Sequence, residues 1–487
     1  MRLLRRILLV LALSLAALAG TIAVRTLALD SPVTLLDAEA VAPAPAFDLD
    51  GAARRVGEAV RFRTIRASDE AYAPEFDRFH EWLASAYPAA HAVMQKEVVA
   101  GRTLVYTWAG SDASRPAMLL LAHHDVVPVT GGTDSQWSHP PFSGTVADGA
   151  VWGRGTIDDK GSLVAIFEAL EALASHGFRP ARTVIVVSGH DEETGGTGAA
   201  AAAQLLRSRG TQLEFVLDEG LATVTDFPLL GRPVALVGVA EKGYGTLRIT
   251  APATGGHSSA PPPETGVEVM ARAVLAITSQ PFPMRFDGPA ADMLRALAPH
   301  APLPVRVAVA NDWLFEPLLV RQLASTPGGA ATLHTTIAPT MLRGSPQENV
   351  LPQDAAAWIN YRIAPGHSAA AVLDHARAAT GGLAVEIDWQ RPPYEPSRVS
   401  STGSDAFRLI ATLASERGSV PVAPGLVTAT TDSRSFADLA GDVYRYQPIH
   451  ASMREFEMIH GTDEHLKLEN LERLVTFYAR LVATAAR

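Results

Sequence analysis

The turn that follows one short apolar run constrains this chain more than any other feature. The run Thr183–Ser188 is β-branched, long enough for a buried strand and too short for a helix. It leads directly into His190, Asp191, Glu192 and Glu193. Like charges this close repel one another, so the acidic pair needs a nearby cation or raised pKa values. A solvated acidic loop is the ordinary interpretation of such a pair. Open α/β sheets, however, place their ligands at strand ends, so the stretch predicts a site at the edge of such a sheet.

Other predicted strand ends carry groups of the same kind. The apolar run 117–122 leads into His123 and Asp125, and the run 215–217 leads into Asp218. An apolar helix follows the Asp158 turn, and His460 comes after the last predicted strand. Strands and helices alternate between these points, which predicts an α/β fold with a mainly parallel, twisted sheet and helices on both faces. The titratable groups are then expected to meet at one edge of that sheet, although no single spacing proves a site.

The middle of the chain has a different texture. Between residues 241 and 395 the predicted elements follow the order β-α-β-β-α-β, which is typical of a ferredoxin-like α+β module. Residues 281–327 do not fit that order and are expected to form an extra helical excursion. With 487 residues the chain is too long for one simple core. We therefore predict one domain formed by residues 48–240 and 396–487, interrupted by an inserted domain at 241–395.

The amino terminus predicts a membrane segment. Three arginines within the first six residues precede the uncharged apolar run Ile7–Val24, which is about the minimum length for a membrane-spanning helix. Basic residues on this side keep the amino terminus in the cytoplasm and place the rest of the chain across the membrane. Residues 17–19 also fit a signal-peptidase site, so a secreted or periplasmic protein after cleavage is the alternative. Residues 1–25 are expected to be the anchor or signal segment, and the proline- and alanine-rich residues 26–47 a linker.

Charge and composition exclude several function classes. The formal net charge is −10 and no basic stripe offsets it, which argues against a nucleic-acid partner. The chain has no cysteine, which excludes a disulfide scaffold, a thiol nucleophile and a cysteine-type zinc site. It also lacks the Gly-x-Ser-x-Gly elbow of serine hydrolases and the His-Glu-x-x-His helix of many zinc proteases. The histidines and carboxylates that remain suit zinc or, less exclusively, cobalt or manganese.

The motifs at the strand ends arrive in the order found in one enzyme family. They are His123-His124-Asp125, Gly153–Gly161, Asp191-Glu192-Glu193, Asp218 and His460. Together they resemble the successive motifs of the di-zinc aminoacylase and carboxypeptidase family. The resemblance spans roughly residue 48 to the carboxyl terminus. It looks closest to the branch that holds carboxypeptidase S and the N-fatty-acyl-amino-acid hydrolases. Each motif alone is modest, but their joint order is a strong signal.

The resemblance implies a set of ligands for two Zn²⁺ ions, with Co²⁺ or Mn²⁺ as alternatives. His123 and Asp218 would complete one zinc site. Glu193 and His460 would complete the other. Asp158 would bridge the two ions, which fits a shared carboxylate and a bridging water.

Two further carboxylates would act on these ligands and on water. Asp125 would orient His123 and raise its basicity. Glu192 would be the general base that takes a proton from water and returns it to the leaving amine. The peptide bond between Asp158 and Asp159 is cis in similar enzymes, and the same is expected here.

The inserted module would be a lid over the site. The resemblance assigns His257 to the lid histidine that polarises the scissile carbonyl. Asn349 and Arg362 match the lid residues that hold the substrate. Residues 431–434 match a substrate loop more weakly. Modules of this type also serve dimerisation, so a homodimer is an open expectation.

These features predict a membrane-anchored, metal-dependent hydrolase whose catalytic domain lies on the non-cytoplasmic side. It would cleave the amide bond of peptides or N-acyl amino acids and release a carboxyl-terminal amino acid. A non-catalytic, membrane-anchored binding module on the same scaffold is the competing interpretation. The two differ in whether the metal ligands and the base survive, and in this sequence all of them are present.

Overall fold

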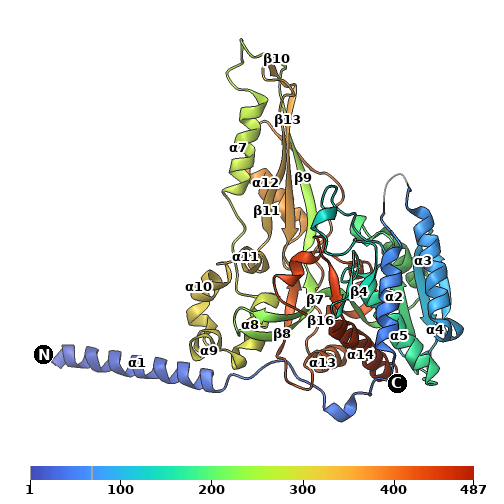
Figure 1. The fold of residues 1–487 in the computed structure, drawn as a ribbon. Coiled ribbons are helices and arrows are strands. Elements are labelled where there is room, and N and C mark those ends of the chain that lie inside the picture. Colours follow the sequence, from blue (N-terminus) through green and yellow to red (C-terminus); the bar gives the residue numbers. More distant parts are fainter. Residues whose placement is uncertain (1, 67–69) are drawn as a thin grey trace.

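A mixed eight-stranded sheet forms the centre of the molecule (Figure 1). The computed structural model describes residues 2–66 and 70–487. From one edge to the other the strands are β1 (Gln95–Val99), β2 (Thr103–Trp108), β6 (Val184–Ser188), β3 (Ala117–Leu121), β7 (Leu213–Phe227), β16 (Ala440–Ala451), β8 (Arg232–Glu241) and β15 (Val422–Val427). The middle four run parallel, whereas β2 runs antiparallel to β6, and β8 antiparallel to β7. The expected parallel sheet is therefore the centre of a mixed one, because the hairpins β1–β2 and β7–β8 add antiparallel strands.

Helices cover both faces of this sheet, as the alternation of elements predicted. Strand residues alternate between the faces, so Leu120 joins the larger apolar cluster and Leu119 the smaller one. The larger cluster includes α2 (Leu49–Arg61), α5 (Lys160–Ser175), α13 (Asp405–Ala414) and α14 (Leu468–Ala485). The smaller one includes α6 (Thr197–Ser208). The helices α3 (Ala73–Ala86) and α4 (Pro88–Val93) pack at the side of the larger cluster.

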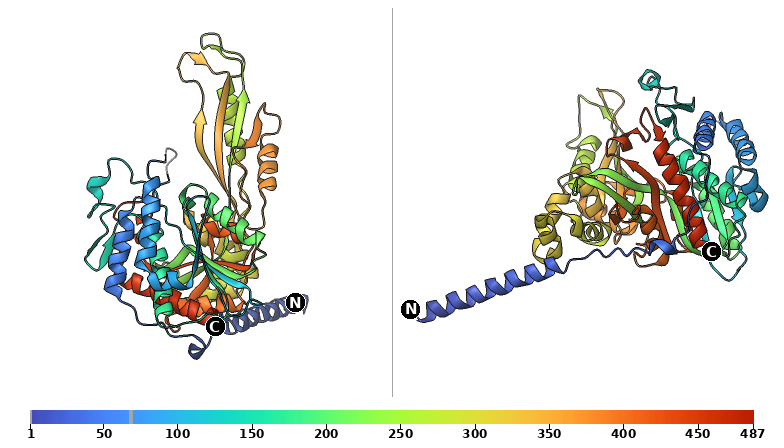
Figure 2. Two further views of the ribbon diagram at one scale, coloured as in Figure 1. Left: turned by 90° about the vertical axis from the view of Figure 1, so that its right-hand side faces the viewer. Right: turned by 60° about the horizontal axis from the view of Figure 1, so that its bottom comes forward.

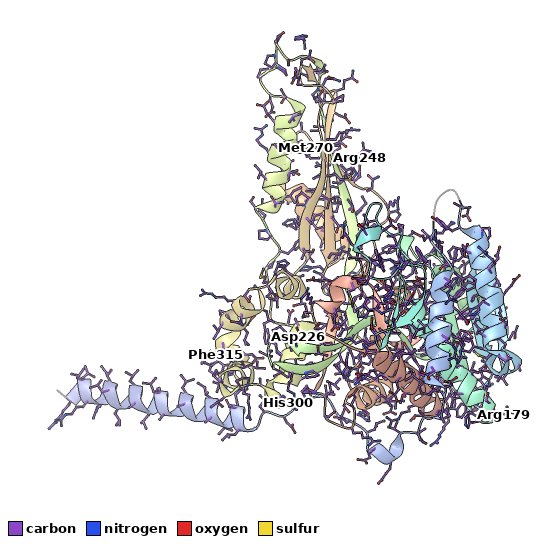
Figure 3. All side chains as sticks on the ribbon, viewed as in Figure 1. Arg179, Asp226, Arg248, Met270, His300 and Phe315 are labelled. Atoms are coloured by element: carbon purple, nitrogen blue, oxygen red, sulfur yellow. The ribbon has the colours of Figure 1, made fainter. Side chains whose placement is uncertain are left out.

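A second, smaller sheet projects from the first and forms the expected ferredoxin-like module (Figure 2). Its strand order is β11 (Thr336–Arg343), β13 (Asp354–Ile363), β9 (Gly243–Pro252) and β14 (Glu386–Trp389), and all neighbours are antiparallel. The helices α7 (Gly266–Thr278) and α12 (Ala369–Ala379) share one apolar core with this sheet, and the buried Met270 of α7 belongs to it (Figure 3). At the far tip, β10 (Gly256–His257) pairs with β12 (Val350–Leu351).

Between α7 and β11 the chain forms the expected helical excursion. It contains α8 (Gly288–Leu297), α9 (Leu303–Ala310), α10 (Asp312–Leu323) and α11 (Pro327–Leu333). Leu297 at the end of α8 packs with Val234 and Ala423, which belong to the large sheet. The excursion therefore lies against the edge of the central sheet, although it is inserted in the sequence of the smaller module.

The amino-terminal helix α1 (Arg2–Leu27) runs away from the body (Figures 1 and 2). It is long and apolar enough to cross a membrane, and none of its apolar window is buried in the protein. Residues 28–47, expected to be part of a linker, instead lie along the domain that contains the central sheet. The N–H of Leu36 donates to Thr412 and that of Ala42 to Thr484, at 2.8 and 2.9 Å. Apolar side chains of this segment pack in the larger apolar cluster, which also contains side chains of α13 and α14. The segment is therefore part of the folded domain and is not a solvated tether.

Candidate metal centre

The carboxylate of Asp158 lies between two histidines at the edge of the central sheet. Its Oδ1 is 2.9 Å from Nε2 of His123, which follows β3. Its Oδ2 is 3.0 Å from Nε2 of His460, which lies in the loop after β16. The peptide bond between Asp158 and Asp159 is cis, as expected. Each oxygen faces a different imidazole, and this is the arrangement of a carboxylate that can bridge two cations.

Each of these histidines meets a further carboxylate. Nε2 of His460 is 3.1 Å from Oε2 of Glu193, in the turn after β6. Nε2 of His123 is 3.5 Å from Oε1 of Glu219, on β7. Donor atoms of His123, Asp158 and Glu193 lie within 4.8 Å of one another. Imidazole nitrogens and carboxylate oxygens at this spacing are the donor set of zinc, cobalt or manganese sites.

The structure places Glu219, and not the expected Asp218, beside His123. Oδ2 of Asp218 accepts from the N–H of Ser433 at 2.8 Å, so this side chain holds the 431–436 loop. The strand expected at 215–217 continues as β7 through both acidic residues, and neighbours on a strand point to opposite sides. The adjacent acidic pair was visible in the sequence, but the predicted strand was too short to show which member faces the site.

Asp125 is completely buried and contacts residues of the centre. Its carboxylate accepts from the backbone N–H groups of Glu192 and Glu193, at 3.2 and 3.1 Å. The same carboxylate lies 3.4 Å from Nδ1 of His123, and the backbone oxygen of Asp125 lies 3.0 Å from that nitrogen. One side chain thus positions the histidine and the turn that carries both glutamates.

Buried carboxylates gather around Glu192. Burial raises the pKa of Glu192, and repulsion from Asp432 raises it further, while His123 opposes the change. Burial and repulsion from Asp158 raise the pKa of Glu219 to about 7. Gly189 makes room for Asp432, because a Cβ there would lie 2.2 Å from its carboxylate. Divalent cations would relieve this concentration of negative charge, so the residues present fit a metal centre.

The two histidines carry the opposite shift. Hydrogen bonds that its imidazole donates to Asp158 and Glu193 raise the pKa of His460 to about 10. Burial lowers the pKa of His123, but hydrogen bonds that its imidazole donates to Asp125 and Asp158 outweigh this effect and leave the pKa well above its ordinary value. In the metal-free protein, the protonated imidazoles therefore donate hydrogen bonds to the carboxylates. Their protons offset the negative charge that bound cations would otherwise offset.

Glu464 holds the loop that carries Asp158 through hydrogen bonds, and the sequence motifs do not predict this role. Its fully buried Oε1 accepts from the backbone N–H groups of Gly155, Ile157 and Asp158, at 3.0, 2.9 and 3.2 Å. Its other oxygen accepts from Arg154 at 2.7 Å. Because Glu464 lies four residues after His460, it ties two elements of the centre together. Its sequence signal was weak, since it stands in a short polar run that looks solvated.

The expected lid residues fall into two places. His257 and Asn349 are exposed neighbours at the tip of the smaller module, where the N–H of Ser258 donates to the backbone oxygen of Asn349 at 3.1 Å. The structure does not bring either of them to the centre. Arg362, by contrast, lies on β13 at the base of the module, and its guanidinium carbon is 4.8 Å from the centre of the Tyr244 ring.

A second arginine, Arg434, contacts both the base of the module and a turn of the candidate metal centre. The guanidinium of Arg434 lies 4.5 Å from the ring centre of Tyr394, whose backbone pairs with that of Tyr244. Nη2 of Arg434 also donates to the backbone oxygen of Gly195, in the turn that follows Glu193, at 3.2 Å. Each arginine thus lies against one of two paired tyrosines at the base of the module, and Arg434 also contacts the turn that follows Glu193.

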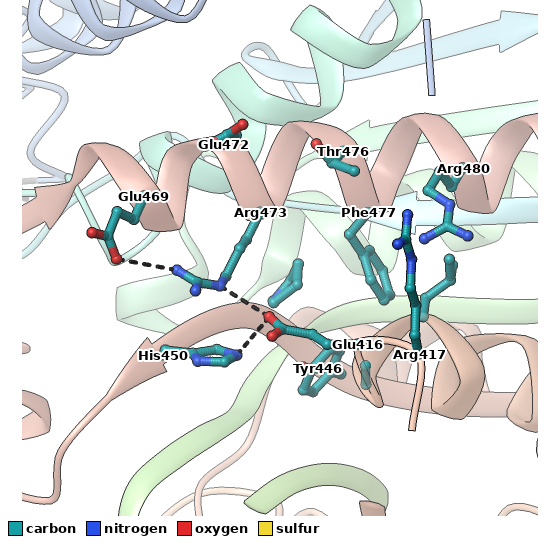
Figure 4. A pocket seen from close by; sticks show the side chains of 13 residues that line it. Glu416, Arg417, Tyr446, His450, Glu469, Glu472, Arg473, Thr476, Phe477 and Arg480 are labelled. Atoms are coloured by element: carbon teal, nitrogen blue, oxygen red, sulfur yellow. Dashed lines mark hydrogen bonds and ion pairs between the residues drawn. The ribbon is translucent and has the colours of Figure 1, made fainter. Parts of the chain in front are cut away.

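A separate pocket of about 490 Å³ lies between α13, α14 and β16 (Figure 4). His450 and Arg473 both contact Glu416 there at 3.0 Å. None of the residues that surround Asp158 line this pocket.

Comparisons with known proteins agree with this geometry. Residues 119–484 match the model of peptidase family M20/M25/M40. The chain is 38% identical over 443 residues to probable carboxypeptidase S-like 2 of Dictyostelium discoideum, with 88% of this chain and 84% of that protein covered. It is 36% identical over 437 residues to human N-fatty-acyl-amino acid synthase/hydrolase PM20D1, with 88% and 86% covered. The fold matches an M20 family metallo-carboxypeptidase from Sulfolobus solfataricus with a TM-score of 0.64 at 16% identity, covering 89% of this chain and 98% of that one.

Proposed function

Because the chain belongs to peptidase family M20/M25/M40 and is a metal-dependent hydrolase, we propose that it releases a carboxyl-terminal amino acid by cleaving the amide bond of small peptides or N-acyl amino acids. The observation that carries this proposal is the carboxylate of Asp158, whose two oxygens face His123 and His460. The names of the relatives, a carboxypeptidase S-like protein and an N-fatty-acyl-amino acid synthase/hydrolase, support both substrate classes.

Two metal ions would bind to one bridging carboxylate and two outer pairs of ligands. His123 and Glu219 would hold one ion, and Glu193 and His460 the other, with Asp158 shared. Zinc fits this donor set, as do cobalt and manganese. When bound, such ions would polarise the scissile carbonyl and lower the pKa of the attacking water.

Glu192 would be the general base. Its half-buried carboxylate lies near His123, and the carboxylate of Asp125 accepts from its backbone N–H. Bound cations would favour the ionised form of this carboxylate, which could then take a proton from water and deliver it to the leaving amine. The presence of these candidate ligands and of this base supports the catalytic proposal over the non-catalytic alternative.

The base of the smaller module would hold the substrate's free carboxylate. The guanidinium groups of Arg362 and Arg434 lie against the rings of Tyr244 and Tyr394, and these two tyrosines pair at the base of the module. A guanidinium forms two parallel hydrogen bonds to a carboxylate, which fixes the amide at a defined distance from the centre. Closure of residues 241–395 over the centre would complete this contact.

His257 and Asn349 would act in a second copy of the chain. They lie side by side at the exposed tip, far along the module from its base (Figure 1). In a homodimer, the tip of one chain would supply them to the centre of the other. Mixing Glu192→Gln with His257→Ala chains tests this, because each mixed dimer then keeps one complete centre. Recovered activity supports the homodimer, whereas activity no higher than that of either variant contradicts it.

The helix α1 would anchor the protein, with the catalytic domain on the non-cytoplasmic side. Its apolar window is unburied, and the flanking arginines fit that orientation. The contacts between Arg25 or Thr26 and α9–α10 lie beyond Ala19, so they would survive signal cleavage and do not decide between the two outcomes. Salt-resistant partition into membranes supports the anchor, and a soluble protein beginning at Gly20 supports cleavage.

The experiment for the proposed reaction is a substrate panel with purified, metal-loaded protein. N-acyl amino acids and dipeptides with free carboxylates should be hydrolysed, and a chelator should abolish the activity. Zinc or cobalt should restore it. Hydrolysis that continues at full rate after the metal content has fallen well below one ion per chain would contradict the proposal.

A further inference from the structure

The carboxyl-terminal end of α1 is joined to the turn between α9 and α10. Nε of Arg25 donates to the backbone oxygen of Ala310 at 2.8 Å, and the guanidinium lies 3.9 Å from Asp312. The side-chain amide of Asn311 donates to the hydroxyl of Thr26 at 3.3 Å, and both side chains are buried. These contacts hold the turn at the level where α1 leaves the body (Figures 1 and 2).

Anchored in a membrane, α1 would fix the depth of that turn. The run Ile7–Val24 rises about 27 Å at 1.5 Å per residue, close to the hydrocarbon thickness of about 30 Å. Arg25 comes next and would lie at the level of the lipid headgroups. The turn at 310–312 touches Arg25, so it would lie at the same level.

Directly after this turn, α10 exposes apolar side chains. Trp313, Leu314 and Leu318 are 55, 40 and 55% exposed. Pro317 is exposed on the same side at helical spacing, and these four residues are called the α10 face below. The exposed Arg321 continues along it. The opposite side of this helix packs against the protein. Leu319 is buried in the apolar cluster of the excursion, and Phe315 packs against the same cluster (Figure 3).

We propose that the α10 face rests on the surface of the bilayer that α1 crosses. The proposal rests on the proposed anchor, which places this face at headgroup level. Tryptophan is enriched at that level, and an amphipathic helix there buries its apolar side chains while a basic residue meets lipid phosphates. With α1 and the α10 face both in contact with lipid, the catalytic domain has two points of attachment and cannot swing freely about a single helix.

The absence of cysteine makes the test direct, since one introduced cysteine carries a spin label at one known position. The full-length chain is reconstituted in vesicles of phosphatidylcholine and phosphatidylglycerol with the label at Leu318→Cys, and with Leu314→Cys as a second position. Leu11→Cys in α1 is the reference for lipid, and Ser208→Cys at the exposed end of α6 is the reference for water. Collisions of each label with oxygen, which concentrates in lipid, are compared with collisions with a water-soluble nickel chelate.

The labels at positions 314 and 318 should shift from the water reference toward the lipid reference. If both match Ser208→Cys while Leu11→Cys lies in lipid, the anchor stands and the α10 contact is overturned. A water-exposed Leu11→Cys overturns the anchor and the contact with it. Loss of collisions with both oxygen and the nickel chelate at positions 314 and 318, together with dipolar coupling between the labels of two chains, would identify a second copy as the occupant of the face and would also overturn the proposal.

Discussion

In two pairs of adjacent acidic residues, 192–193 and 218–219, the two members make different contacts. Glu193 faces His460, while Glu192 is half-buried near His123. Glu219 faces His123, while Asp218 accepts from the backbone of Ser433. Substituting one member of a pair at a time therefore distinguishes effects on catalysis from effects on metal binding and on the packing of the neighbouring loop.

Glu192→Gln should retain both metal ions and lose catalysis. The amide keeps the size and polarity of the side chain but cannot take a proton from water, and removal of a general base typically costs about 10²–10⁴-fold in rate. The measurement is kcat/KM together with metal content. Activity within a few fold of the unmodified protein, at equal metal content, would place the base elsewhere.

Glu219→Gln and Asp218→Asn form a matched pair. We expect Glu219→Gln to weaken metal binding by more than the about 10–100-fold that the loss of a supporting hydrogen bond costs. Asp218→Asn should bind metal nearly normally, because its carboxylate contacts Ser433 and not an imidazole. Metal content and affinity are measured for both variants. The reverse order of losses would return Asp218 to the ligand set.

Metal binding should release protons. In the metal-free protein the carboxylates raise the pKa of His460 to about 10 and that of His123 well above its usual range, so both imidazoles are protonated near neutral pH. Each must become neutral to bind, so metal affinity falls as the pH is lowered and rises as the pH approaches about 10. Calorimetry in buffers of different ionisation enthalpy counts the protons. A count near zero at neutral pH would show that the imidazoles are already neutral.

At the scale of elements, buried polar contacts connect the sheet to the loops that carry the site. Glu241 at the end of β8 accepts from Nε of Arg445 on β16 at 2.9 Å, and both are almost completely buried. The same oxygen accepts from the hydroxyls of Thr431 and Ser433 at 2.6 and 3.1 Å. Two strands and the 431–436 loop therefore depend on one carboxylate.

Glu241→Ala should lower stability strongly, since it leaves the charge of Arg445 buried without its partner, at a cost of about 3–5 kcal/mol. The exposed pair Arg343 and Asp354, at 2.6 Å, provides the control. Arg343→Ala should change stability by about 0–1 kcal/mol. The measurement is the apparent Tm of the first unfolding transition. Equal effects of the two variants would show that the Glu241 contacts do not hold the site together.

The sequence predicted most elements because their periodicity was regular, and it failed where tertiary contacts decided the outcome. The order β-α-β-β-α-β was recognisable from local patterns, as were His123, Asp158 and His460 from their places after strands or before a helix. The length of β7 was not, because its second half is held by pairing with β8 and β16 and not by an apolar run of its own. That pairing decides which acidic neighbour faces the centre. Glu464 was missed for a similar reason, since its importance lies in backbone donors about 300 residues away.

At the scale of the whole molecule, the centre lies at the edge of the central sheet, and a smaller module projects from the domain that contains this sheet. The sheet supplies the candidate metal ligands, and the base of the module supplies Arg362, while its tip lies far along the module (Figure 2). This division predicts that binding of the substrate's carboxylate and the chemistry at the metals depend on different parts of the chain. A substrate that lacks the carboxylate should lose the contact with the module and keep the contact with the metals.

The most direct test of this account compares kcat/KM for an N-acyl amino acid and for its carboxamide, in the unmodified protein and in Arg362→Ala. The unmodified protein should strongly prefer the free carboxylate, because the amide cannot form the charge-assisted pair of hydrogen bonds with a guanidinium. Arg362→Ala should lose that preference, and it should do so at unchanged metal content, with Arg362→Lys restoring little of it. If the unmodified protein hydrolyses the acid and the amide at the same rate, the proposal that it releases carboxyl-terminal amino acids is wrong.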